Sequence, residues 1–261
     1  MTSEHIDELF ARTLVGDYED EAPWEAVREL RRIGSRRVFD RAVEWSGASD
    51  PMIRARGLDV LAQIGRTADH PSNSFPDECF SVVQRVLRGE REIRPLDSAI
   101  AALGHLDNPA GIPLILQHRS HPDSEIRLSV ACALGSFSND ARSAECLMVL
   151  MKDEDEEVRD WATFELGVTA DLDTPEIRDA LVERLSDPNE DVRQEAMAGL
   201  GKRRDRRVLP LLVATLEQSD AAIPVIEAVR DMLEMDGNRE NLSTDDYLSA
   251  LRARFGLQFG R

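Results

Sequence analysis

The chain has 261 residues, of which 42% are hydrophobic, 31% are charged and only 5% are aromatic. This composition excludes a wholly disordered chain, and the 50 acidic against 32 basic residues give a net charge of −18. A surface this acidic repels nucleic acid and anionic lipid except where a local basic patch overrides the net charge. The cysteines Cys79, Cys132 and Cys146 lack the spacing of a disulfide framework or zinc site. With no secretion signal and no long apolar run, we predict a cytoplasmic protein.

The N-terminal segment predicts a short amphipathic helix followed by an acidic link. Ile6, Leu9, Phe10 and Leu14 recur at helical spacing, and residues 17–21 are rich in Asp and Glu. We interpret residues 1–21 as a capping element that covers the exposed end of the structure that follows.

From residue 22 onward the chain repeats one pattern, an aliphatic residue and Arg, then small residues, then Leu-Gly. Three copies are clear, at residues 126–135, 158–167 and 192–201, and looser copies precede them. Such a period is typical of solenoid proteins. The longest step holds a Pro/Ser/Asn-rich insertion, residues 67–77, which is either a plain loop or a functional one. The repeat glycines are Gly34, Gly65, Gly104, Gly135, Gly167 and Gly201.

Each copy predicts a pair of helices. Val158, Ala162 and Leu166 recur at i, i+4 and i+8, which is helical spacing, and a more aliphatic helical segment lies between copies. The closing glycine indicates a helix C′ position with positive φ, and the Asp before several copies indicates a helix N-cap. The aliphatic segments are residues 79–87, 112–117, 144–151, 177–185 and 208–216, and the capping candidates are Asp50, Asp153 and Asp187.

The C-terminal segment, residues 237–261, predicts a second capping helix. Ser243 to Asp246 opens it, and its apolar residues are Tyr247, Leu248, Leu251 and Phe255. The fold class we predict is therefore all-α: an α-α superhelix of about six helical hairpins over residues 22–236, with a capping helix at each end.

The repeated signature resembles the HEAT repeat of the bacterial HEAT-like class. Asp50-Pro51-Met52-Ile53-Arg54 and Asp187-Pro188-Asn189-Glu190-Asp191-Val192-Arg193 carry the resemblance most clearly, and it covers about residues 20–235. It implies a solenoid that supplies binding surfaces rather than one chemistry. The signatures of ankyrin and tetratricopeptide repeats are missing.

Enzymes on similar scaffolds offer three alternatives. The di-iron deoxyhypusine hydroxylase carries His-Glu pairs on its inner helices, and no His-Glu dipeptide occurs in this sequence. HEAT-like alkylpurine DNA glycosylases use an Asp with Trp residues in a basic groove. Asp160-Trp161 is similar, but it lies in a segment, residues 151–200, with 16 acidic and 5 basic residues. Phycobilin lyases remain a background alternative. We predict no metal and no cofactor.

Two groups of basic residues have structural interpretations. Arg54, Arg127, Arg159 and Arg193 each follow an aliphatic residue at the start of a repeat, and we expect each to bond the Asp of the neighbouring repeat, forming a ladder along the stack. The run from Lys202 to Arg207 lies in a turn and is a weaker candidate for contact with an anion.

The inner surface of the superhelix is the candidate binding site. The third, fourth and seventh positions of the pattern should point away from the core of each repeat, which makes Trp161 and Phe164 neighbours on a small-residue, acidic face. An exposed aromatic pair rimmed by carboxylates resembles a binding hot spot, while burial of both rings between helices is the competing interpretation. The candidate partner-binding residues are Arg56, Asp97, Asp160, Trp161, Phe164 and Glu195.

These observations predict a non-enzymatic protein-interaction module whose acidic inner surface binds a basic protein or peptide, and neither nucleic acid nor membrane. A specific form is an inhibitor or immunity-type protein that caps a basic toxin. The alternative is an enzyme or small-ligand binder with its site around Asp97, Asp160 and Trp161.

Overall fold

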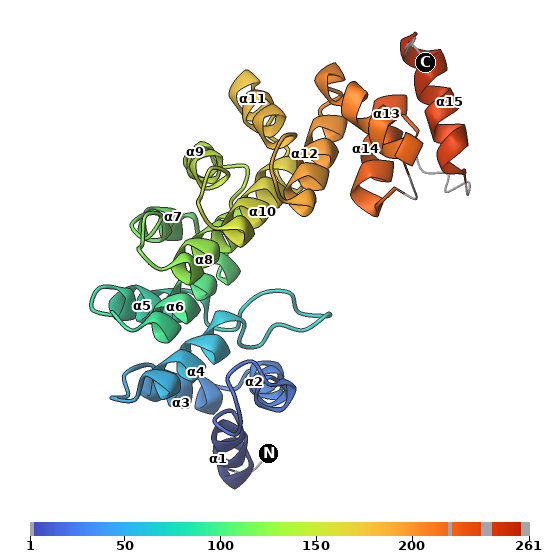
Figure 1. The fold of residues 1–261 in the computed structure, drawn as a ribbon. Helices are drawn as coiled ribbons and strands as arrows, with labels where there is room; N and C mark the ends of the chain where they lie inside the picture. Colours follow the sequence, from blue (N-terminus) through green and yellow to red (C-terminus); the bar gives the residue numbers. More distant parts are fainter. Residues whose placement is uncertain (1–2, 219–220, 236–241, 257–261) are drawn as a thin grey trace. The chain divides into compact units, whose positions relative to one another are not determined.

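The computed structural model describes residues 3–218, 221–235 and 242–256. Within these ranges every regular element is a helix, so the all-α fold class is confirmed. The chain forms two compact units, Met1–Phe137 and Ser138–Arg261, which we call unit 1 and unit 2. We describe each by itself (Figure 1).

Unit 1 is built from consecutive helical hairpins. The helices that carry the repeated pattern pack on one another as an inner row, α4, α6 and α8, and an outer helix precedes each of them. The elements are α1 (Ser3–Arg12), α2 (Glu21–Ile33), α3 (Arg36–Ser46), α4 (Pro51–Ala62), α5 (Pro76–Leu87), α6 (Ile93–His105), η1 (Pro109–Gly111), α7 (Ile112–Leu116) and α8 (Ser124–Gly135).

Unit 2 continues the same alternation. Its inner row is α10, α12 and α14, and its outer helices are α9, α11 and α13. The elements are α9 (Ala141–Leu150), α10 (Glu156–Phe164), a π turn η2 (Glu165–Thr169), α11 (Pro175–Arg184), α12 (Glu190–Lys202), η3 (Arg206–Val208), α13 (Leu209–Gln218), α14 (Ile223–Leu233) and α15 (Thr244–Phe255).

The repeat glycines do not all serve the purpose expected from the sequence. Gly34 and Gly65 have the positive φ of a C′ residue, +54° and +79°. Gly201 does not, and a Cβ added to it would lie 2.5 Å from the Cα of Ala228 on the next inner helix. Its role is close helix approach, because only a residue without a side chain fits there. The expected positive φ is likewise wrong for Gly104, Gly135 and Gly167.

The arginines that open the inner helices bond the turns around them. Arg54 donates to both carboxylate oxygens of Glu90, at 2.8 and 3.0 Å, and Arg159 to both oxygens of Asp187, at 3.1 and 3.2 Å. The Arg159–Asp187 pair confirms the expected bond to an Asp of the neighbouring repeat, whereas the partner of Arg54 is a Glu. Arg193 instead donates to the carbonyls of residues 187 and 188, just before its own helix. Such bidentate contacts fix the repeat spacing as well as adding stability.

The inserted segment, residues 67–77, is held against unit 1. The side-chain amide of Asn73 donates to the Leu61 carbonyl at 2.9 Å, and the backbone N–H of Ser74 donates to the Ile64 carbonyl at 2.8 Å. The ring of Phe75 packs on Phe39 with centroids 4.8 Å apart. These contacts account for the segment as part of the helix connection.

The terminal helices have the expected positions with one correction. Ile6, Leu9 and Phe10 are buried in α1, but the helix ends at Arg12 and Leu14 lies beyond it, 38% exposed. α15 begins with a capping box between Ser243 and Asp246. Of the expected cap over residues 237–261, residues 237–241 and 257–261 lie outside the described residues.

Candidate functional site

The inner row of unit 2 exposes an aromatic pair. Trp161 on α10 is 42% exposed, and Phe164, one turn later, is half-buried. Their rings meet edge to face, with centroids 5.9 Å apart and an interplanar angle of 81°. The structure thus confirms that Trp161 keeps solvent access and that Phe164 lies beside it. Edge-to-face packing fixes the indole in place without covering it.

Asp160 precedes this pair and lacks a counter-charge. Its Oδ1 atom is buried and accepts no hydrogen bond from any residue that the structure describes. Burial raises the pKa of this carboxyl, and the nearby carboxylates Asp191, Asp187 and Glu157 raise it further. A buried acceptor without a donor is costly.

Glu195 on α12 shares the same environment. Burial raises its pKa to about 7, with further contributions from the negative charges of Asp160, Asp191 and Glu227. These groups come from α10, α12 and α14, so carboxylates of three successive inner helices repel one another. Neither Asp160 nor Glu195 makes an ion pair within the described ranges. The face therefore has an uncompensated negative potential beside two aromatic rings.

In unit 1 the chain covers part of its own inner row, and one of the expected site residues, Arg56, is buried there. Arg56 was expected on an accessible surface, but its side chain is 1% exposed. The guanidinium donates to the carbonyls of Thr13 and Tyr18, at 2.9 and 2.7 Å, and pairs with Asp59 at 3.3 Å. Because the link between α1 and α2 covers it, Arg56 is not available to a partner in this structure.

Tyr18 is the residue that the sequence did not point to. Its ring lies between the guanidinium groups of Arg56 and Arg94, 3.8 and 4.5 Å from the ring centroid. Its hydroxyl donates to Asp59 at 2.6 Å and lies 3.0 Å from the Ser98 hydroxyl. The only sequence signal is a single aromatic residue inside the acidic link. The link thus fills the inner row at α4 and α6 with its own side chain.

Asp97 is also engaged within unit 1. It accepts a short hydrogen bond from Ser129 and lies 3.9 Å from the Arg94 guanidinium. Burial raises its pKa, in spite of the hydrogen bond from Ser129. Arg94 also pairs with Glu125 at 2.9 Å, so the acids around Asp97 have a cation among them.

The basic run after α12 is largely committed to neighbours. Lys202 pairs with Asp171 at 2.9 Å, and Arg207 pairs with Asp205 and Asp179. The buried Arg203 donates to the carbonyls at the end of the preceding inner helix, Leu166, Gly167, Ala170 and Leu172. These bonds tie the end of α12 to η2 and to the residues that follow it.

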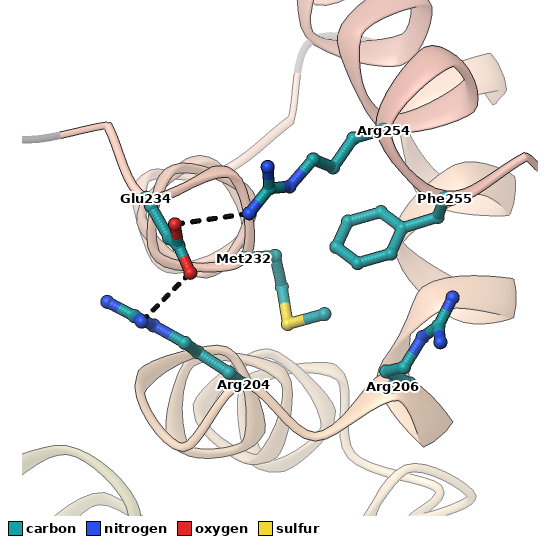
Figure 2. Close-up of a pocket in the computed structure, with 6 residues that line it drawn as sticks. All are labelled: Arg204, Arg206, Met232, Glu234, Arg254 and Phe255. Atoms are coloured by element: carbon teal, nitrogen blue, oxygen red, sulfur yellow. Dashed lines mark hydrogen bonds and ion pairs between the residues drawn. The ribbon is translucent and has the colours of Figure 1, made fainter.

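Arg204 and Arg206 of the same run line a small pocket between α15 and its neighbouring helices. Figure 2 shows the Glu234 carboxylate between Arg204 and Arg254, at 3.0 and 3.1 Å. The Arg206 guanidinium lies 5.3 Å from the centroid of the Phe255 ring. We interpret the pocket as a structural tie, because the acid already bridges two of its three cations.

The described residues contain no cluster of three or more His, Cys, Asp or Glu side chains suited to a metal ion. None of their helices is long and apolar enough to cross a membrane. The chemistry that the unit 2 face does offer is electrostatic attraction, aromatic contact and one carboxyl group that titrates near neutrality.

Comparison with known families agrees with the repeat architecture. The family model for HEAT repeats matches residues 86–167 and 147–233, which together span more than half of the chain. The chain belongs to the HEAT-repeat family. The matched ranges include the inner row of unit 2 as far as α14.

Individual relatives extend this result. Protein YibA of Escherichia coli is 28% identical over 232 residues, 87% of this chain and 80% of YibA. The X-ray structure of YibA aligns with a TM-score of 0.73 at 24% identity, covering 97% of this chain and 93% of that chain. The two proteins share a helical repeat fold. The alpha subunit of phycocyanobilin lyase from Thermosynechococcus vestitus is 26% identical over 152 residues, 58% of this chain and 55% of that protein.

Proposed function

We propose that the protein is a non-enzymatic protein-interaction module, and that the inner row of unit 2 binds a basic segment of a partner protein. The observation that carries the proposal is the exposed Trp161 ring, held against Phe164 beside the uncompensated carboxylates Asp160 and Glu195. An arginine or lysine of the partner would contact the indole face and bring a positive charge close to Asp160 and Glu195.

Charge supports the same class of partner. The chain carries a net charge of −18, which accelerates encounter with a basic protein and opposes binding to nucleic acid or anionic membranes. We place the protein in the cytoplasm. The specific form of the proposal is an inhibitor or immunity-type protein that covers a basic toxin.

A peptide titration tests the proposal. An octa-arginine peptide is added to the wild type, to Trp161→Ala and to Asp160→Asn, and binding is followed by calorimetry at about 150 mM salt. We expect Trp161→Ala to weaken binding about tenfold or more, as at an aromatic hot spot. This substitution leaves the net charge unchanged, so the loss reports the ring and not general attraction to an acidic protein.

The matched control is Ile223→Ala, which removes another exposed apolar side chain of unit 2, 75% exposed at the start of α14. This variant should bind as the wild type does. Equal affinity for the wild type and Trp161→Ala would refute the site.

The second candidate function is an enzyme or small-ligand binder. One observation favours it: Glu195 has a pKa of about 7, which suits a general acid or base at neutral pH. Of its three expected residues, Asp97 lies in unit 1 and Asp160 and Trp161 in unit 2, so the candidate is restricted here to the α10 and α12 side chains.

The similarity to a lyase subunit suggests a probe for this second function. Phycocyanobilin is mixed with the wild type and with Glu195→Gln, and its visible absorption is recorded. A spectral change that needs Glu195 supports a ligand site, whereas an unchanged spectrum supports the interaction module.

A further inference from the structure

The outer helices of unit 2 form a second surface that the inner row does not explain. A groove of about 570 Å³ lies between α9 and α11. On the inner side the same two hairpins come close, because a Cβ at Gly199 would lie 2.7 Å from the Cα of Gly167. The outer helices leave the groove open between them. Its lining residues are Glu145, Met148, Val149, Lys152, Glu176, Asp179, Ala180 and Glu183.

The lining follows helical periodicity on both sides. One side of the groove is lined by residues 145, 148 and 149 of α9 and by residue 152 just after it. The other side is lined by residues 176, 179, 180 and 183 of α11, and both sets have the spacing i, i+3, i+4, i+7. Each helix thus presents one continuous stripe to the groove. An amphipathic helix is recognised by grooves of this kind.

The floor of the groove is apolar and open to solvent. Val149 is 63% exposed at the centre of the α9 stripe, beside the half-buried Met148 and opposite the buried Ala180. The helix α9 needs no aliphatic residue at this position for its own core, since Leu147 and Leu150 are buried there. An aliphatic side chain in the middle of a groove favours burial by another molecule.

The rim is acidic and only partly neutralised. Lys152 pairs with Glu183 at 2.7 Å and closes one end of the groove. Asp179 pairs with Arg207, which lies outside the lining. Glu145 and Glu176, near the other end, make no ion pair with any residue that the structure describes. With these two pairs formed, Glu145 and Glu176 are the acids of the lining without an ion pair, and they favour a cationic occupant.

We propose that this groove binds a basic amphipathic helix of a partner protein, with its apolar stripe on Val149 and its cations at Glu145 and Glu176. The positions from 145 to 152 span about 10 Å of helix axis, so the groove accommodates about two turns of the occupant. The proposal concerns a face separate from Trp161 and stands without the function proposed above.

A pair of designed peptides tests it. The probe is an N-acetylated peptide of about 14 residues built from Leu and Lys, with Leu at i, i+3, i+4 and i+7, and its twin carries Glu in place of Lys. Binding is measured by calorimetry and helix formation by circular dichroism. We expect the Lys peptide to bind and gain helix, and Val149→Lys to weaken binding about tenfold or more. Glu145→Gln should weaken it by about two- to fivefold, in proportion to a partly screened charge.

The controls separate this groove from other surfaces. Ile223→Lys places the same charge on another exposed aliphatic site of unit 2 and should leave affinity within about twofold of the wild type. Trp161→Ala should have no effect on this peptide. Equal binding by Val149→Lys and the wild type would overturn the proposal, as would equal binding of the Glu twin. Sedimentation that shows a dimer lost in Val149→Lys would also overturn it, by assigning the groove to a second copy of the chain.

Discussion

Replacing Glu195 with glutamine should stabilise the folded protein at about pH 8 but have little effect at about pH 5. Folding raises the pKa of this carboxyl from 4.5 to about 7, through burial first and then repulsion from Asp160, Asp191 and Glu227. Between these two values the folded state keeps a proton that the unfolded state has released. Stability therefore falls as the pH rises through this window, and the loss is complete above about pH 7.

The size of the effect follows from the same values. A shift from 4.5 to about 7 corresponds to at most about 3 kcal/mol. Solvent screening at this half-buried position reduces the expected gain of Glu195→Gln to about 1–2 kcal/mol at the higher pH. Urea unfolding of both proteins at the two pH values measures it. The control is Glu8→Gln, which replaces an exposed carboxylate of α1. A gain that is the same at both pH values would refute the raised pKa of Glu195.

Three further predictions concern single side chains. Trp161→Ala should lower the free energy of unfolding by about 1–2 kcal/mol, because the protein loses one aromatic contact and the buried part of a ring that is 42% exposed. A loss of about 3 kcal/mol or more in chemical denaturation would show that the residue is structural. Tyr18→Phe should cost about 1–3 kcal/mol in the same assay, because it removes the hydroxyl that donates to the buried Asp59. Gly201→Ala should lower the free energy of unfolding by about 1–3 kcal/mol through overpacking. Gly89→Ala is the control: an added Cβ there meets nothing within 4 Å, and this variant should stay within about 0.5 kcal/mol of the wild type. Equal melting temperatures for the two variants would contradict the close-approach role of Gly201.

The fold could be predicted because its information is periodic. The aliphatic-Arg pattern returns at nearly constant intervals, and both the buried stripe and the inter-repeat bonds of Arg54 and Arg159 follow from that period. The same register predicted that Trp161 and Phe164 share an exposed face, since both positions are set by their distance along a single helix.

What the sequence could not give depends on contacts between residues far apart in the chain. Tyr18 and Asp59 are 41 positions apart, and no local pattern indicates that the link turns back over α4. The sequence at the end of a repeat is similar whether its glycine adopts a positive φ, as Gly65 does, or allows the next helix to approach closely, as Gly201 does. The pKa of Glu195 likewise depends on carboxylates from other helices, whose proximity only the packing determines.

The two inner rows differ in how their acids are compensated, and this difference bears on the binding site that we propose. In unit 1 the chain meets Asp59 with its own groups, the Arg56 guanidinium and the Tyr18 hydroxyl. In unit 2 the equivalent helices present Asp160 and Glu195, neither of which makes an ion pair with a described residue. Burial first, and then repulsion from neighbouring carboxylates, raises the pKa of both groups. Burial raises the pKa of Asp59 in unit 1 as well, in spite of these partners. The difference lies in the partners: Asp59 has a cation and a donor from its own chain, whereas Asp160 and Glu195 have no ion pair in the part of the chain that the structure describes. A cation brought by another molecule would offset the repulsion among the acids of unit 2, and this supports the binding site that we propose beside Trp161.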